Sequence, residues 1–525
     1  MKNLTMLALC ALPILCFGQN SAPQIEITGI EANQTAETLT VNYALNDADG
    51  DACDVWFKMS IDGGTFFEVV PEDNLSGDTG MDINSSETLS LTWDYSDLTE
   101  SIETVQIQVF ASDNHPVDIA EMVSQVSEAE LLATMQAIVG ERHYSAAPDH
   151  LAFVRSHITD AFSNANLQTE VYDFTHNSAA MQNILGRKPG VKDESATIII
   201  DGHFDAVPGS PGADDNGSAA AGVLEALRIL SQYSFEHSIR FIGFDAEELG
   251  LIGSKRYVLY GIKPFEDIQG VLNMEMIGFY SDEPNSQELP TGFEMLFPGA
   301  AQEVADDEYR GNFLFACGNT DSNPLRLALI AASETYVPEL RLITVSLPGT
   351  GTIAPDLRRS DHAPFWDAGM QALMLTDAAD FRNPNYHTPG DSIGTLNFAF
   401  MKNVVKATLA TAAELAKPIS VSHDHADLST VLGIHDHGHS FPAEVTLFPN
   451  PTNGLLAIGL KDAKAGFDAR IEVFELTGKR VHRDIIQFPA GTSTSTVDLQ
   501  NLAAGSYMLV LYASDTSKSI GFVVE

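Results

Sequence analysis

The sequence IRFIGFDAEELG, residues 239–250, begins as an apolar run and ends in a group of acidic residues. A short apolar run bounded by polar residues is typical of a buried strand. The run TIII at 197–200 has the same character and leads into DGHFD at 201–205. Because ligands gather beyond the carboxyl ends of strands in α/β sheets, both acidic segments are candidates for a functional site.

Outward from these two runs, apolar strands alternate with segments of helical periodicity. We expect further strands at 270–274 and 372–375. This alternation predicts an α/β fold, with a mixed, mostly parallel sheet and helices on both faces, over residues 126–418. The expected helices are 128–139, 149–164, 218–231, 324–335 and 398–416.

Two smaller segments with strand periodicity flank this region. Residues 23–118 alternate between apolar and polar side chains, which predicts an immunoglobulin- or fibronectin-like β-sandwich. Residues 444–525 alternate in the same way and predict a second small β-domain, after a polar, histidine-rich linker at 419–443. We interpret the Asp-rich cluster at 47–51 as a plain turn, with calcium binding as the alternative. Metal scavenging by the histidines remains an alternative to a simple linker.

Composition restricts the partners and the destination of the protein. A formal net charge of −44 over 525 residues excludes nucleic acid and anionic membranes as expected partners. Residues 1–18 have the pattern of a signal peptide, and no later stretch is long and apolar enough to span a membrane. We therefore expect a secreted or cell-surface protein, exported through the periplasm. Cys53 and Cys317 fall in different predicted domains, so we expect two buried thiols and no disulfide.

Five side chains spread over residues 203–387 have the chemistry of a two-metal site. Two divalent metals that share one bridging oxygen need about five nitrogen or oxygen ligands, several of them anionic. Four of these five side chains lie just after the end of a predicted strand. Asp205 lies two residues after His203 and is placed to orient the imidazole ring of His203. The predicted metal ligands are His203, Asp215, Glu248, Glu275 and His387.

The adjacent glutamates predict a division of labour. Neighbouring side chains point apart, so one can bind metal while the other takes a proton from water. The alternative is a helix start at which acidic residues favour the positive end of the dipole. Asp361 and Asp391 either support the last ligand or, for Asp361, cap a short helix.

With these segments in view, residues 126–418 resemble the co-catalytic zinc peptidases of family M28. The resemblance rests on GHFD at 202–205, GADDN at 212–216, EE at 247–248, SDHAPF at 360–365 and YHTPGD at 386–391. It implies a zinc-exopeptidase-like fold and two zinc ions per chain. One zinc would take Asp215, Glu248 and His387, and the other His203, Glu275 and the shared Asp215. It further implies Glu247 as general base, Asp205 in support and Tyr386 stabilising the oxyanion.

The last 80 or so residues resemble a sorting domain of the type IX secretion system. The residues that carry this resemblance are LFPNPTNG at 447–454, LTGK at 476–479 and LAAGSY at 502–507. It implies the type IX secretion machinery as a partner. The closing residues, 521–525, lack the basic ending that such domains often have.

The functional expectation is a secreted di-zinc exopeptidase that hydrolyses peptides through a metal-bridged hydroxide. Many acids border the site, which favours an aminopeptidase, whereas Arg358, Arg359 and Arg382 leave a carboxypeptidase open. Family members often carry Asp where this chain has Glu275, a position where glutaminyl cyclases have Glu. A single-zinc cyclase is therefore one alternative, and a non-catalytic receptor-like protein is another.

Overall fold

In the computed structural model, the described residues are 20–33, 35–61, 63–96, 105–428, 444–463, 466–475, 480–500, 502–503, 505–513 and 516–524. The predicted signal peptide, residues 429–443 of the predicted linker and the motif at 476–479 lie outside them. Among the described helices, none is long and apolar enough to cross a membrane.

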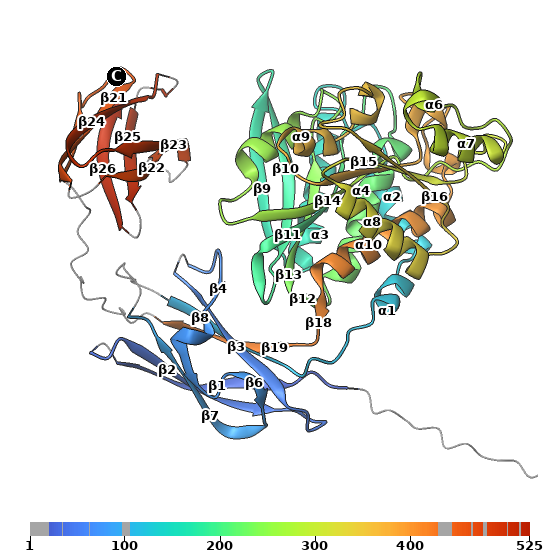
Figure 1. Cartoon of the computed structure of the whole chain (residues 1–525). Helices are drawn as coiled ribbons and strands as arrows, with labels where there is room; N and C mark the ends of the chain where they lie inside the picture. Colours follow the sequence, from blue (N-terminus) through green and yellow to red (C-terminus); the bar gives the residue numbers. More distant parts are fainter. Residues whose placement is uncertain are drawn as a thin grey trace, which may run out of the picture.

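The amino-terminal part is a sandwich of two antiparallel sheets (Figure 1). Its strands are β1 (Gln24–Asn33), β2 (Thr38–Asn46), β3 (Cys53–Ser60), β4 (Glu68–Val69), β5 (Leu75–Gly77), β6 (Gly80–Ile83), β7 (Ser86–Asp94) and β8 (Val105–Ser112), with the short helix η1 (Glu72–Asn74). One sheet has the order β1-β2-β7-β5, and β8, β3 and β4 belong to the other. Alternate residues such as Val41, Phe57 and Ile107 fill the space between the sheets, as period-two patterning requires.

One strand of this sandwich comes from beyond the α/β domain. β19 (Ser422–Leu428) pairs antiparallel with β8. Our expectation of a loop throughout 419–443 is therefore wrong for 422–428. The edge of β8 offers main-chain partners, and Ala426 and Leu428 pack against the sandwich core. His423 stacks on Phe110 at 4.9 Å between ring centroids, so this histidine is part of a sheet.

An eight-stranded mixed sheet forms the centre of the α/β domain. Its strands are β9 (Gln168–His176), β10 (Ala179–Lys188), β11 (Asp193–His203), β13 (His237–Phe244), β14 (Asp267–Glu275), β15 (Leu314–Asn319), β16 (Leu342–Leu347) and β17 (Ala372–Thr376). The order is β16-β15-β17-β14-β11-β13-β10-β9. The neighbours β17, β14, β11 and β13 run parallel, whereas β9 and β10 are antiparallel. The predicted fold class is confirmed, although the sequence patterns did not reveal β9, β10, β15 and β16.

Helices cover both faces of this sheet (Figure 1). In β11, Ile198 and Ile200 pack on one face and Ile199 on the other, which explains the continuous apolar run. One face is covered by α1 (Ile119–Ser124), α2 (Glu128–Ile138), α3 (Pro148–Asn164), α4 (Ala219–Leu230), α8 (Asn323–Tyr336) and α10 (Phe398–Ala416). The other face packs against η3 (Tyr257–Gly261), α6 (Phe293–Leu296), α7 (Pro298–Asp306) and α9 (His362–Asp367). The remaining short elements are η2 (Ala213–Ser218), α5 (Ile252–Arg256), η4 (Pro355–Arg358), η5 (Ala379–Phe381), η6 (Ile393–Thr395) and the pair β12 (Ser234–Phe235) and β18 (Pro418–Ile419).

The carboxyl-terminal part is a second β-sandwich. Its strands are β20 (Glu444–Phe448), β21 (Leu455–Ala463), β22 (Phe467–Glu475), β23 (Arg480–Phe488), β24 (Gly491–Asp498), β25 (Gly505–Ala513) and β26 (Thr516–Val524). They form the sheets β20-β21-β24 and β23-β22-β25-β26. Ile458, Ile471 and Leu509 are fully buried between these sheets, so this segment has a core of its own.

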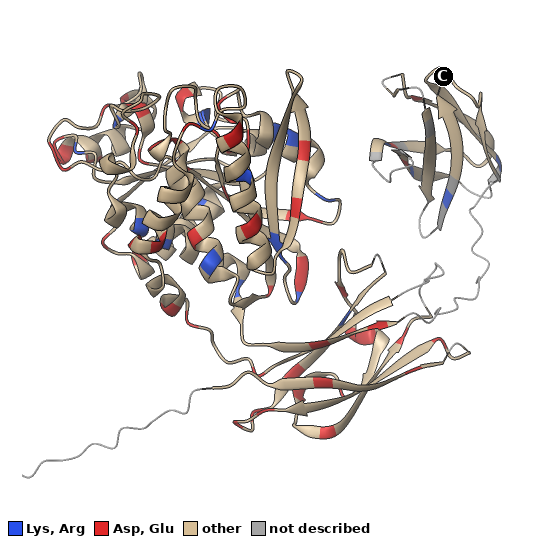
Figure 2. Ribbon diagram, turned by 180° about the vertical axis from the view of Figure 1, so that it is seen from behind, with Lys and Arg blue, Asp and Glu red and all other residues tan. Residues whose placement is uncertain are grey.

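A buried polar seam joins the amino-terminal sandwich to the α/β domain. Lys58 Nζ lies 2.6 Å from Glu194 Oε1 and donates to Gly190 O at 2.9 Å. Trp56 Nε1 donates to Val191 O at 2.9 Å. These contacts lie at the amino end of β11, far along the strand from His203. The ribbon in Figure 2 shows Asp and Glu residues spread over both parts with fewer Lys and Arg residues among them, in keeping with 72 acidic and 28 basic residues.

Candidate metal centre and active site

Neighbouring parallel strands bring the predicted site residues to one edge of the sheet. His203 is the last residue of β11, and Glu275 is the last residue of β14. Glu247 and Glu248 follow the end of β13, which pairs with the other side of β11. Asp215 lies in η2 between β11 and α4. Because parallel strands end at the same edge, residues distant in sequence converge there.

The five predicted ligands form two groups that meet at Asp215. His203 Nε2 lies 3.4 Å from Asp215 Oδ1 and 3.4 Å from Glu275 Oε2. On the other side, His387 Nε2 lies 2.9 Å from Asp215 Oδ2 and 3.2 Å from Glu248 Oε2. Each carboxylate oxygen of Asp215 therefore faces a different imidazole. This arrangement suits a carboxylate that bridges two cations.

Glu247 lies beside the first of these groups. Its Oε2 is 3.8 Å from His203 Nε2, and the ligand atoms of His203, Glu247 and Glu275 all lie within 4.8 Å of one another. Glu247 is buried, and burial raises the pKa of its carboxyl well above the ordinary value, although the nearby His203 opposes this effect. Glu247 is thus close enough to bind or to exchange a proton at the site.

Unpartnered buried atoms show that the site suits cations. His203 Nε2 and Glu248 Oε1 are buried and have no hydrogen-bond partner among the described residues. Buried polar atoms almost always have partners, so such atoms need a reason. Imidazole nitrogen and carboxylate oxygen are ligands that zinc takes readily. The residues present therefore fit a pair of zinc ions.

Electrostatics within the site favour positive charge. Burial alone would lower the pKa of His387, but hydrogen bonds to Asp215 and Glu248 raise it to about 10. Burial would also lower the pKa of His203, which the carboxylates of Glu247 and Glu275 instead raise well above its usual range. Burial raises the pKa of Glu248 to about 7. The surplus of carboxylates thus holds protons tightly where a metal ion is not bound.

Asp205 supports the site in more ways than its sequence position indicates. His203 Nδ1 donates to the main-chain oxygen of Asp205 at 3.3 Å and lies 3.4 Å from its carboxylate. The same carboxylate accepts the main-chain N–H groups of Glu247 and Glu248 at 3.1 and 3.2 Å. Asp205 therefore couples the first histidine to the glutamate pair.

The bridging aspartate is held from the other side. Asp391 is fully buried and accepts the main-chain N–H groups of Asp214 and Asp215 at 2.8 and 3.1 Å. Ser360 donates to Glu275 Oε2 at 2.7 Å, and Asn216 Nδ2 lies 3.4 Å from the same oxygen. The sequence patterns indicate no role for Asn216 or Ser360, although Asn216 ends the motif GADDN and Ser360 begins the motif SDHAPF.

Asp361 and Tyr386 lie next to the ligands. Asp361 is the residue before α9, yet its side chain makes no capping hydrogen bond. Burial raises the pKa of Asp361 to about 7, and the nearby His203 opposes this. Tyr386 stacks on His387 with 3.7 Å between ring centroids, and its hydroxyl oxygen accepts a hydrogen bond from Arg359 at 3.0 Å. The hydrogen bond that a helix-capping role of Asp361 requires is therefore not present in α9.

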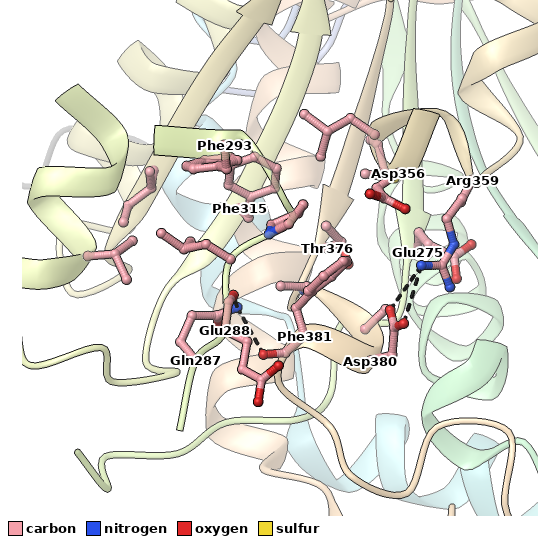
Figure 3. Close-up of a pocket in the computed structure, with 18 of the residues that line it drawn as sticks. Glu275, Gln287, Glu288, Phe293, Phe315, Asp356, Arg359, Thr376, Asp380 and Phe381 are labelled. Carbon is pink, nitrogen blue, oxygen red and sulfur yellow. Dashed lines mark hydrogen bonds and ion pairs between the residues drawn. The ribbon is translucent and has the colours of Figure 1, made fainter. Parts of the chain in front are cut away.

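A largely apolar pocket of about 680 Å³ opens beside these residues (Figure 3). Glu275 and Tyr386 line it on the side of the metal groups, while Glu288, Asp356 and Asp380 add polar atoms. The apolar walls comprise Leu289, Pro290, Phe293, Val304, Phe313, Phe315, Ile343, Leu357, Met374 and Phe381.

Of the three arginines considered for carboxylate binding, only Arg359 lines this pocket. Its Nη1 lies 3.1 and 3.4 Å from the two oxygens of Asp380, and dashed lines mark these contacts in Figure 3. Arg358 makes a bidentate contact with Asp367 at 2.8 and 2.9 Å. Arg382 is buried and donates to Gln287 Oε1 at 2.7 Å. Two of the three guanidinium groups are thus committed to structural contacts.

The fold and the site together define a metal-binding α/β domain of the hydrolase type. Residues 183–412 match the family model described as peptidase family M28, and residues 446–525 match that of a secretion system C-terminal sorting domain. Residues 183–412 are therefore similar to the peptidases of family M28, and residues 446–525 to secretion sorting domains.

Relatives in bacteria resemble the peptidase region. The uncharacterised protein YfbL of Escherichia coli is 30% identical over 223 residues, which cover 40% of this chain and 65% of that protein. Aminopeptidase YwaD of Bacillus subtilis is 30% identical over 216 residues, 40% of each chain. The chain thus spans less than two thirds of either relative. The solved aminopeptidase LapA of Legionella pneumophila has a TM-score of 0.44 and 20% identity, over 57% of this chain and 72% of that one.

Proposed function

We propose that this protein is a secreted, zinc-dependent aminopeptidase. The observation that carries the proposal is the pair of ligand groups that meet at Asp215, directly beside an apolar pocket. One zinc ion would be held by Asp215, Glu248 and His387. The second would be held by His203, Glu275 and the other oxygen of Asp215.

The chain's own residues divide the remaining chemistry. Bound zinc ions would polarise a peptide carbonyl and lower the pKa of a water molecule. Glu247 would accept the proton of the attacking water and pass it to the leaving amine. Tyr386 accepts its hydrogen bond from Arg359, so its own O–H remains free to donate to a developing oxyanion. Asp205 and Asp391 would hold the ligand loops in place.

The electrostatics of the site favour an amino-terminal substrate. Carboxylates surround the ligand groups, and Asp380 already offsets the charge of Arg359, the one pocket arginine of the three. A protonated amine is therefore more stable here than a second carboxylate would be. The apolar pocket would take the first side chain of the peptide, which predicts a preference for large apolar residues such as leucine, methionine or phenylalanine.

The test compares two peptides of the same sequence that begin with leucine. One has a free amine and an amidated carboxyl end, and the other has a blocked amine and a free carboxyl end. We expect cleavage of the first peptide, with release of leucine. Preferential cleavage of the second would replace the aminopeptidase assignment with a carboxypeptidase. A third peptide that begins with glutamate should be cleaved more slowly, because its charge would be buried in the apolar pocket.

Glu275 is the one site residue that favours a glutaminyl cyclase, and no observation on the described residues favours a non-catalytic protein. A single-zinc glutaminyl cyclase does not require both ligand groups, yet both are assembled here. A non-catalytic protein requires neither the groups nor the buried glutamate beside them. A glutamine-initiated peptide in the same assay, with cyclisation as the readout, tests the first alternative directly.

For export, we propose that the carboxyl-terminal sandwich directs the protein through the type IX secretion machinery to the cell surface or medium. The match to a sorting domain and the separate core of this segment support the proposal. We also propose the domain limits 126–418, 444–525 and 23–118, the last completed by the strand at 422–428. Truncation after residue 443 should leave the peptidase folded and active but confined to the periplasm of the host. Loss of activity in the purified truncated protein would show that the last domain belongs to the enzyme proper.

A further inference from the structure

Arg142 is a buried arginine outside all the motifs quoted for the site. It has no exposed surface, although a guanidinium is among the groups least often buried completely. Each of its hydrogen bonds to described residues goes to a main-chain carbonyl oxygen. Nε donates to Phe204 at 2.6 Å, Nη2 to Gly212 at 2.6 Å, and Nη1 to Gly140 and Pro211 at 2.8 Å and to Ile138 at 3.5 Å.

Three of these carbonyls, those of Phe204, Pro211 and Gly212, belong to the two loops that carry ligands. Phe204 directly follows His203 at the end of β11, and Gly212 leads into the turn that contains Asp215. The main chain of Arg142 adds a further link, since its carbonyl accepts the N–H of Ala206 at 3.0 Å. One residue therefore fixes the spacing between the histidine of one ligand group and the carboxylate shared by both.

The contact between Arg142 and Gly212 leaves no room for a side chain at residue 212. Gly212 has a φ of +61°, a conformation that glycine adopts without strain. A Cβ at Gly212 would lie 2.7 Å from Arg142 Nη2 and 2.5 Å from the main-chain oxygen of Asp215. The guanidinium, the glycine and the ligand turn thus pack in direct contact, so a shift of one moves the others.

The charge of Arg142 also acts on the site without occupying it. Burial lowers the pKa of the guanidinium to about 10, against the effect of carboxylates that include Asp205, Asp215 and Glu248. The group remains cationic at neutral pH. Because its N–H groups are taken by carbonyls, the carboxylate oxygens stay free for metal ions while their mutual repulsion is reduced. Lysine cannot reproduce this, since it lacks the planar fork of donors.

We propose that Arg142 is a positioning residue of the metal centre, which sets the separation of the His203 and Asp215 loops and offsets carboxylate repulsion. The inference rests on the proposed zinc site. A purely structural role would change the stability of the protein but leave the affinity for zinc unaltered in the folded state. Zinc affinity is therefore the deciding quantity.

The experiment measures zinc dissociation constants by competition with a chromophoric chelator, in the full secreted chain after residue 18. Arg142→Lys keeps the charge and loses the fork, whereas Arg142→Gln loses both. We expect Arg142→Lys to weaken zinc binding by about 10- to 100-fold, the usual scale for supporting residues of metal sites, and Arg142→Gln to weaken it further. The kcat should fall with zinc content, and KM should change little.

Arg187→Lys is the matched control, because Arg187 is also buried and also donates to a main-chain carbonyl, that of Glu194 at 2.9 Å. It lies at the seam, so zinc affinity should equal that of the wild type. If Arg142→Lys does not fold without zinc, urea unfolding at graded zinc concentrations yields the same constant through ligand stabilisation. If Arg142→Lys bound zinc with wild-type affinity, the inference about Arg142 would be overturned and the proposed function would stand. A wild-type protein that binds no zinc would overturn the proposed function as well.

Discussion

Two clusters of buried charged side chains lie at opposite ends of β11 and are built in opposite ways. At the amino end, cations and anions alternate: Lys58 pairs with Glu194 at 2.6 Å, and Glu194 also pairs with Arg187 at 3.1 Å. The chain of contacts continues through Glu266, which lies 2.5 Å from Arg240. Each charge at the seam therefore has an opposite charge beside it.

At the carboxyl end, acids predominate. Two imidazoles face four carboxylates, and the carboxyl of Glu248 has a raised pKa because burial leaves its charge poorly compensated. Both clusters contain buried atoms that have no hydrogen-bond partner among the described residues, so the balance of charge is what distinguishes them. A cluster whose charges cancel holds two parts of the protein together. A cluster with surplus negative charge instead requires a cation, and such clusters mark functional sites.

Of the changes considered, metal removal should have the largest effect, and this effect should arise at the acid-rich cluster. Prolonged chelation should abolish peptidase activity, and zinc should restore it, because the proposed hydrolysis depends on the bound ions. The measurement is leucine release from a peptide before and after dialysis, with zinc content determined by elemental analysis. Full activity in a verified metal-free sample would contradict the assignment of the site.

The adjacent glutamates should respond differently to the same substitution. Glu247→Gln should retain both zinc ions and lower kcat by about two to four orders of magnitude, the usual contribution of a general base. Glu248→Gln should mainly reduce zinc content. Steady-state kinetics and zinc analysis of both variants form the comparison. The reverse pattern would exchange the two roles.

Breaking the seam should affect stability and leave the chemistry intact. Lys58→Met removes the charge that faces Glu194, and we expect a loss of about 3 kcal/mol in the free energy of unfolding. Zinc content and kcat should not change, because the seam lies at the other end of β11. Lys192→Met is the control, since Lys192 forms an exposed contact with Glu236 at 3.2 Å and should cost less than about 1 kcal/mol. A fall in kcat for Lys58→Met would mean that the two ends are coupled.

The smallest expected effect concerns pH. In the metal-free protein the pKa of Glu248 is raised to about 7 and that of His387 to about 10. A raised folded-state pKa stabilises the protein below the unfolded value and loses that contribution as pH rises through the folded value. The stability of the metal-free protein should therefore decline as pH rises through about 7 and again through about 10. Zinc binds deprotonated ligands, so the stabilisation that zinc adds should increase as pH rises. Thermal scans between pH 5 and 10 with and without zinc test this; a constant difference in Tm would contradict it.

Much of the α/β fold can be predicted from sequence. The runs at 197–200 and 239–244 indicate buried parallel strands because both of their faces are apolar, and α10 was predicted at its observed bounds. The strands β9 and β10 were missed because they mix polar and apolar residues and depend on neighbouring strands for pairing. β15 and β16 were missed because each is only 6 residues long. β19 was missed because only the free edge of β8 makes a strand of residues 422–428.

The sequence by itself identified the side chains that come together at the candidate site. Imidazoles and carboxylates at the ends of apolar strands are recognisable from residue type and order, because strand ends of a parallel sheet converge. Only the tertiary structure decided how they are grouped: that Asp215 faces both histidines, that Arg358 and Arg382 are committed elsewhere, and that Arg142 lies beneath the ligand loops. Those relations depend on distances between segments far apart in the chain. Local patterns carry no such distances, since long-range packing sets them.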